Sequence, residues 1–284
     1  MSFCLECRKI KGTGFLTLFL WGGLLSAAVP ILNMAFRAQI YLTQDASPVQ
    51  ILMDANWHLM SMLNLLLVAA GACLMYHTEY ADCAMQKMQT LPIRESRLFF
   101  GKAALLTIMC ILILGLEAAG ICFCLYRWFI PSARLISNAS NLMASEALVQ
   151  SAVIPLPENL IHPAVPLLPK NLMQPIAPLL SEVLISFGYA LLLLLPAAFG
   201  ALLVASLSKN MWVSLGIGVV CIFTATMLPA RNFALSLFPF ALPFQIFAGT
   251  AQNSLIGFSI AAVVEAFVIG IIEILFLKVR RKFT

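Results

Sequence analysis

The sequence predicts an all-α membrane protein, and three observations support that prediction. Of the 284 residues, 62% are hydrophobic and only 10% are charged, whereas a soluble domain carries about 25% charged residues. The hydrophobic residues are concentrated in six runs, each near the ~20 residues that cross a ~30 Å hydrocarbon core as a helix. Basic residues are unequally distributed between the two sides that these runs define. We therefore expect six transmembrane helices and no soluble domain.

The six runs predict one transmembrane domain that covers residues 1–284. Pro30 and Pro196 fall inside two of the runs, which helices buried in a membrane tolerate. The first run is longer than the ~7–15-residue core of a signal peptide, so we interpret it as a retained helix. The expected spans are residues 15–36, 57–76, 103–126, 183–207, 211–228 and 255–277.

The distribution of Lys and Arg predicts the orientation. Six crossings place both termini on one side, and that side would hold twelve basic residues against five on the other. Because cytoplasmic loops are enriched in basic residues, we expect both termini to be cytoplasmic. The net charge of +5 then reflects topology and attraction to lipid headgroups rather than nucleic-acid binding.

Residues 1–14 predict a short helix that lies in the cytoplasmic interface before the first span. Phe3, Cys7 and Ile10 recur at i, i+4 and i+7, and the basic residues lie off that stripe. None of the eight cysteines falls in an expected outer loop, so no disulfide framework is indicated. The lone CxxC in this segment lacks the second ligand pair that a zinc site needs.

The expected outer side carries a short loop, residues 37–56, and a long insertion, residues 127–182. The first half of the insertion has the spacing of an amphipathic helix, and the second half has seven prolines, which favour extended chain. It is either a folded surface flap or an apolar shelf that meets an amphiphilic substrate. Residues 233–247 are too short to cross and contain Pro239 and Pro243, which predicts re-entrant outer half-helices before the last span.

A polar segment, residues 77–102 ("HTEYADCAMQKMQTLPIRESRLFFGK"), separates the second and third spans. Glu79 and Asp82 stand near the start of a predicted short helix, and a lysine stands near its end, as the helix dipole favours. Pro92 then ends the helix, because the residue before a proline resists the α conformation. We expect a short cytoplasmic helix held parallel to the membrane, suited to docking; a merely solvated loop is the alternative.

The chain contains no motif for common catalytic chemistry. The P-loop pattern G-x-x-x-x-G-K-[ST] is absent, as are H-E-x-x-H and G-x-S-x-G. The three histidines lie at span ends or in the outer insertion, where they are better explained as interfacial residues than as metal ligands. We therefore expect neither an enzyme nor a bound cofactor or metal.

Three acidic residues fall inside the expected spans: Glu117, Glu265 and Glu273. Each costs about 2.5–3.5 kcal/mol in mid-bilayer unless it is paired, protonated or facing water. Glu273 lies near the inner end, where Lys278 or Arg280 would neutralise it. Glu117 and Glu265 lie deeper, and either line a polar pathway that attracts a cationic peptide or make interhelical hydrogen bonds as protonated acids.

The polar segment resembles the cytoplasmic loop of a known family. An acidic residue, a short helix, "LPI" and then "GK" at the foot of the third span are similar to the loop of type-2 ABC transporter permeases. The six-span order, the lead-in helix and the broken outer segment resemble the same family. Within it, "ECRKIKG" and "LFPFALPF" look most like permeases of the lantibiotic immunity and resistance (self-protection) subfamily.

This resemblance implies that the loop is a coupling helix that docks on a separate ATP-binding subunit. It further implies two copies of that subunit, ATP–Mg bound there, and a second permease that is identical or a sister chain, in a bacterial cell membrane. The coupling residues implied for this chain are Glu79, Asp82, Gln86, Gln89, Thr90, Leu91, Pro92 and Ile93.

The function expected from the sequence is export of lantibiotics or similar antimicrobial peptides by an ATP-driven transporter of which this chain is the permease. An alternative keeps the fold and changes the cargo to a drug, a lipid or a polysaccharide precursor. A second alternative is a membrane scaffold or sensor without transport.

Overall fold

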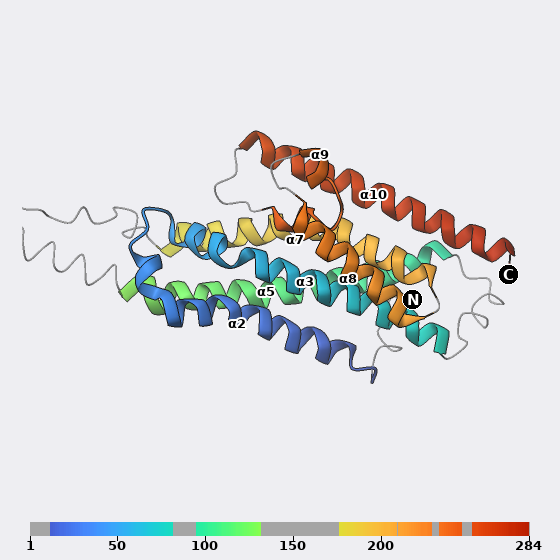
Figure 1. The fold of residues 1–284 in the computed structure, drawn as a ribbon, viewed down its shortest axis with the longest axis horizontal. Helices are drawn as coiled ribbons and strands as arrows, with labels where there is room; N and C mark the ends of the chain where they lie inside the picture. Colours follow the sequence, from blue (N-terminus) through green and yellow to red (C-terminus); the bar gives the residue numbers. More distant parts are fainter. Residues whose placement is uncertain are drawn as a thin grey trace, which may run out of the picture.

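The structure is a computed structural model that describes residues 12–81, 95–131, 176–208, 210–228, 233–245 and 252–283. The described regular elements are helices, with no strand among them, and they pack as an elongated bundle (Figure 1). The long helices are α2 (Phe15–Leu42), α3 (Pro48–Ala81), α5 (Glu95–Cys124), α7 (Ile176–Leu207), α8 (Met211–Met227) and α10 (Gln252–Phe283).

The helix lengths confirm the all-α, multi-span fold class. Within the described residues, five helices are long and apolar enough to cross a membrane. The sixth, α8, is apolar but has only 17 residues, which is at the short end of the ~17–25 residues that span a bilayer. No interfacial helix can be assigned for residues 1–11, which lie outside the described part of the chain.

The connection between α2 and α3 is much shorter than the expected loop over residues 37–56, so that prediction is wrong. Arg37 has φ −129° and ψ 21°, which kinks α2, yet the helix resumes and ends at Leu42. Helix α3 begins at Pro48, whose fixed φ suits a first helical position. The polar Asn56 stays inside α3 because its amide donates to the Leu52 carbonyl at 2.8 Å.

The polar segment is likewise shorter than the expected 77–102. Helix α3 continues through Ala81, and α5 begins at Glu95, so charged residues at both ends of the segment belong to helices that extend beyond the apolar core. Before the last span, where we expected half-helices over 233–247, the described residues form the single-turn helix α9 (Phe233–Ser236) and the 3₁₀ turn η3 (Leu242–Phe244). Helix α5 passes into a π-helical turn, η1 (Leu125–Phe129), at its end.

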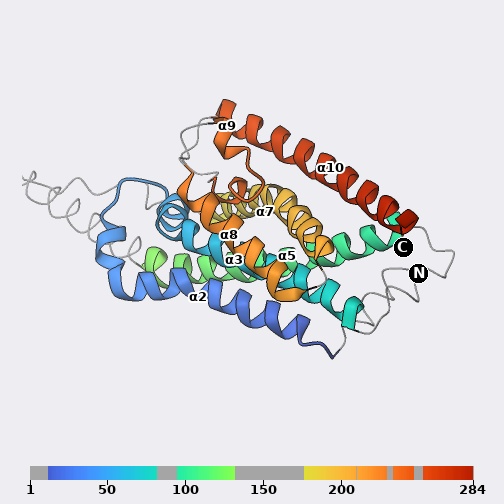
Figure 2. The same cartoon turned by 45° about the vertical axis from the view of Figure 1, so that its right-hand side comes forward.

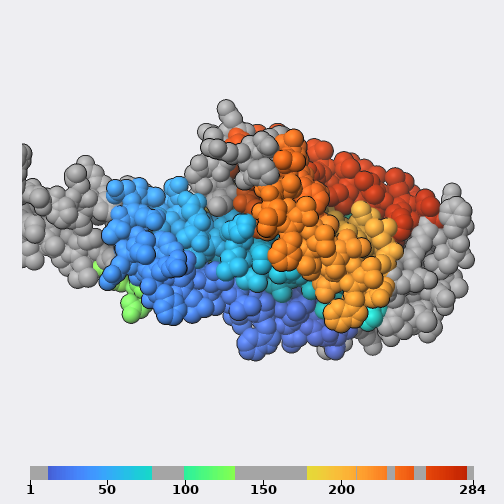
Figure 3. Space-filling view, viewed as in Figure 1, coloured from blue at the N-terminus to red at the C-terminus, as the bar shows by residue number. Residues whose placement is uncertain are grey.

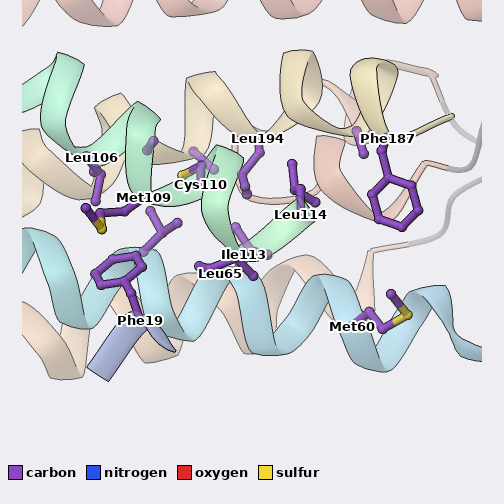
Figure 4. Close-up of a cluster of buried hydrophobic side chains, with 14 of the residues drawn as sticks. Phe19, Met60, Leu65, Leu106, Met109, Cys110, Ile113, Leu114, Phe187 and Leu194 are labelled. Atoms are coloured by element: carbon purple, nitrogen blue, oxygen red, sulfur yellow. The ribbon is translucent and has the colours of Figure 1, made fainter. Parts of the chain in front are cut away.

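Apolar side chains from α2, α3, α5 and α7 fill the centre of the bundle (Figure 4). Phe19 of α2 and Leu65 of α3 face Leu106 and Ile113 of α5, and all four are fully buried. Helix α8 packs against α3, and its side chains form much of the near surface in the space-filling view (Figure 3). Helix α10 lies at the edge of the bundle against α7 and α5.

Small residues let α2 and α5 approach closely. A Cβ at Gly120 of α5 would lie 2.8 Å from the carbonyl oxygen of Ala27, and one at Gly23 of α2 would lie 2.8 Å from Cδ1 of Leu116. In lipid there is little hydrophobic force between helices, so van der Waals contact of this kind and interhelical hydrogen bonds hold them together.

Candidate coupling site

Several chain segments reach the same end of the bundle (Figures 1 and 2). Helix α2 begins there, α3 ends there at Ala81, α5 begins there at Glu95, and α10 ends there. The polar segment between α3 and α5 therefore starts and finishes at this end. Of the expected coupling residues, Glu79 lies in the last turn of α3. The other seven lie outside the described residues: Asp82, Gln86, Gln89, Thr90, Leu91, Pro92 and Ile93.

Three buried polar side chains join the base of this segment to the last helix. The hydroxyl of Tyr76, on α3, donates a hydrogen bond of 2.8 Å to Oε1 of Glu273, on α10. The Nζ of Lys102, on α5, lies 3.6 Å from the centroid of the Tyr76 ring and within electrostatic reach of the Glu273 carboxylate. We call Tyr76, Lys102 and Glu273 the basal cluster.

Burial makes the basal cluster energetically important. Tyr76 and Lys102 are each 3% exposed, and Glu273 is 0% exposed. A charge this deep is costly unless an opposite charge and hydrogen bonds compensate it. A desolvated ammonium over an aromatic ring contributes about 2 kcal/mol, so the ring and the carboxylate both favour Lys102 at this place. Separating the three helices would leave the buried charges of the basal cluster without their compensating partners. The cluster therefore holds the helices together at this end.

The basal cluster differs from the sequence-based expectation for Glu273. We expected Lys278 or Arg280 to neutralise it, but Lys278 is exposed, whereas the ammonium of Lys102 lies close enough to act on the Glu273 carboxylate. Neighbours on the same helix were the obvious partners in the sequence. The partners that the fold supplies come from two other helices, and only their positions at the two edges of the polar segment hinted at a shared role.

Glu117 of α5 forms a second buried polar group, near the middle of the bundle. It is 0% exposed. Ser26 of α2 donates a hydrogen bond to its Oε1, and Nδ2 of Asn64, on α3, donates to its Oε2 at 3.1 Å. The carboxyl thus joins three helices through interhelical hydrogen bonds. The Oδ1 of Asn64 is buried and accepts no hydrogen bond from the described residues.

Glu265 of α10 is not part of the Glu117 network. Its side chain is half-buried, and its Oε2 is buried without a hydrogen-bond partner among the described residues. Helix α10 contacts α7 and α5, whereas the hydrogen bonds of Glu117 go to α2 and α3. Glu117 and Glu265, for which a polar pathway and interhelical hydrogen bonding were both open, therefore occupy separate surroundings.

The segment before α10 is anchored to α3 through one carbonyl group. Nε1 of Trp57 and Oγ of Ser61 both donate to the carbonyl oxygen of Pro243, each at 2.9 Å. The ring of His58 lies 4.9 Å from that of Phe244, between centroids. Trp57 and Tyr76 are nineteen residues apart on α3, which corresponds to about 28 Å, so this anchor and the basal cluster lie at opposite ends of the helix.

The length and apolar composition of these helices define a multi-pass membrane protein. The chain belongs to the ABC-2 family of transporter proteins: the model of that family, described as "ABC-2 family transporter protein", matches residues 3–162, more than half of the chain. The matched part includes the polar segment, Tyr76, Lys102 and Glu117. Comparison with curated proteins and with solved structures gives no match.

Membership of this family makes the chain the permease subunit of an ABC transporter, a membrane transport component that is not itself catalytic. Members of the family work with an ATP-binding subunit in general. Within the described residues, no three His, Cys, Asp or Glu side chains are grouped so as to hold a metal ion.

Proposed function

We propose that this permease belongs to an ATP-driven exporter that expels lantibiotics or similar antimicrobial peptides from the bacterial cell membrane. The basal cluster is the observation that supports ATP-driven transport in this proposal. A force applied to the polar segment reaches α3 and α5 directly, and Tyr76 and Lys102 transmit it to α10 through Glu273. Closely packed, hydrogen-bonded contacts transmit small displacements because packed interfaces deform little before they switch.

In this proposal the polar segment is cytoplasmic and docks on a partner that binds ATP–Mg. Two such ATP-binding subunits act on two permeases, the second being a copy of this chain or a sister chain. Both termini are cytoplasmic. The contact set on this chain is Glu79, Asp82, Gln86, Gln89, Thr90, Leu91, Pro92 and Ile93.

The proposed substrate class rests on the apolar outer segments and on the buried acids. The insertion over residues 127–182 is rich in apolar residues, as binding of an amphiphilic peptide requires. Glu117 and Glu265 supply the negative charge that attracts a cationic peptide. Because Glu117 is enclosed by α2 and α3, a peptide reaches it only if those helices move relative to α5.

The coupling part is tested by replacing Leu91, Pro92 and Ile93 with Gly-Ser-Gly in the assembled transporter. We expect normal membrane insertion, loss of protection against a lantibiotic such as nisin, and ATP hydrolysis that no longer responds to the peptide. The matched control replaces Gln44, Asp45 and Ala46 with the same residues, because this short connection lies between α2 and α3 and outside the polar segment. Unchanged protection in the first variant would disprove the proposal.

Substrate identity is tested separately with a panel of antimicrobial peptides and small-molecule drugs, comparing cells with and without the transporter. Protection against peptides alone supports the proposal. A shift confined to small molecules would replace the peptide with a drug as cargo. Protection that persists when the partner cannot hydrolyse ATP would indicate a scaffold or sensor instead.

A further inference from the structure

An apolar groove lies between α5, α7 and α10, next to the basal cluster. Its volume is about 330 Å³, and only apolar side chains and Gly270 line it. This volume lies at the lower end of the ~300–1,000 Å³ usual for ligand clefts. The residues used below are Phe99 and Phe100 of α5, Phe199 of α7, and Val263, Gly270 and Ile274 of α10.

The groove is open toward the surroundings of the bundle rather than enclosed. Phe100 is 60% exposed and Val263 is 55% exposed, and both lie on the walls. Along α10 the lining extends from Ala262 to Ile274, twelve residues further on, or about 18 Å of helix. That length is close to one leaflet of a ~30 Å hydrocarbon core.

A positive charge stands where the groove ends. Lys278 follows Ile274 by four residues on α10, so it lies on the same face of the helix, one turn further. It is exposed and forms no ion pair with the described residues. The sequence adds Arg280, Arg281 and Lys282 in the following turn. Clusters of basic residues directly beyond a membrane helix attract anionic lipid headgroups.

We propose that the groove holds one acyl chain of an anionic phospholipid, with its phosphate at Lys278. In the proposed orientation the lipid belongs to the inner leaflet. The apolar lining, the length of about one leaflet and the charge at the end each match a different part of that molecule. The occupant touches Phe99, three residues before Lys102, and Ile274, next to Glu273, so the lipid supports α5 and α10 where the basal cluster joins them.

The test measures lipid retained by the purified full-length chain in detergent, using native mass spectrometry. The probes are phosphatidylglycerol and phosphatidylcholine with identical acyl chains, and glycerol phosphate as the soluble headgroup. The wild type is expected to retain phosphatidylglycerol preferentially, and excess glycerol phosphate should not displace it. Lys278→Gln should weaken phosphatidylglycerol binding about fivefold, the effect of one basic residue near a headgroup, and leave phosphatidylcholine unchanged. Arg37→Gln, an exposed position on α2, is the control.

A second variant fills the groove. Gly270→Leu should reduce retention of both phospholipids, whereas Gly216→Leu on α8, where an added Cβ meets nothing within 4 Å, should not. If Gly270→Leu fails to fold by circular dichroism, Gly270→Ala replaces it, because its Cβ meets Phe99 at an ordinary 3.8 Å. Wild-type retention in the groove variant would overturn the proposal. Full displacement of the phospholipid by glycerol phosphate would also overturn it. A groove variant that loses its dimer but keeps its lipid would overturn it as well, and would assign the groove to a second copy of the chain.

Discussion

The hydroxyl of Tyr76 and the carboxylate of Glu273 form a hydrogen bond of 2.8 Å across 197 positions of sequence. Tyr76 is the last residue of an apolar run, and Glu273 lies in the final transmembrane helix. Their bond joins the helix that leads into the polar segment to a helix that the sequence places at the other end of the protein. Movement of the polar segment relative to α10 must therefore break this bond or carry α10 with it.

Tyr76→Phe tests this bond while keeping the aromatic ring beneath Lys102. The variant leaves Oε1 of Glu273 without its donor, and an unsatisfied buried acceptor costs about 1–3 kcal/mol, or more when it is charged. We expect a lower midpoint of thermal unfolding in detergent and weaker stimulation of the partner ATPase by substrate. Tyr126→Phe is the matched control, because Tyr126 is 71% exposed. Equal midpoints for both variants would contradict the structural role of the bond.

Glu117→Leu should destabilise the bundle more than Glu117→Gln. Leucine removes both acceptors and leaves the Ser26 hydroxyl and the Asn64 amide without partners in the core, whereas glutamine keeps an acceptor of similar shape. Interhelical hydrogen bonds in membranes contribute about 0.6 kcal/mol on average and up to about 1.7. Thermal unfolding of the two purified variants gives the comparison, and a less stable glutamine variant would refute the acceptor role.

Gly120→Ala should separate α2 from α5, whereas Gly115→Ala on the same helix should be tolerated. The added Cβ at residue 120 would lie 2.8 Å from the backbone carbonyl oxygen of Ala27, and backbone cannot move aside as a side chain can. At residue 115 nothing lies within 4 Å. A cysteine pair placed across α2 and α5 would report the separation as slower crosslinking. Equal crosslinking in the two variants would show that the close approach is not required.

Removing both donors to the Pro243 carbonyl should cost more than the sum of the single losses. In Trp57→Phe the carbonyl keeps Ser61, and in Ser61→Ala it keeps Trp57, so each single variant leaves the group satisfied. The double variant leaves it without a donor from α3, which costs about 1–3 kcal/mol for a buried polar group. The rate of proteolysis next to residues 233–245 measures how far this segment detaches from α3. Single and double effects that simply add would contradict the prediction.

The composition and the apolar runs were sufficient to predict the helical membrane fold, because a bilayer admits few alternatives. A run of twenty apolar residues satisfies its backbone only as a helix, so helix number and approximate position follow from the sequence. The family followed from short motifs around the polar segment, and the match over residues 3–162 confirms an ABC-2 permease. The lantibiotic assignment stays a prediction, since it rests on shorter motifs than the family does.

Only the tertiary structure decided which polar groups meet. The sequence showed that Glu117 and Glu273 need partners, yet Ser26, Asn64, Tyr76 and Lys102 come from other helices. Helical spacing defines neighbours within one helix, whereas the rotation and depth of each helix against the others depend on the packing of all of them. Helix ends at Leu42 and Ala81 were missed for a different reason: an apolar run marks where a helix can lie in lipid, not where its backbone hydrogen bonds stop.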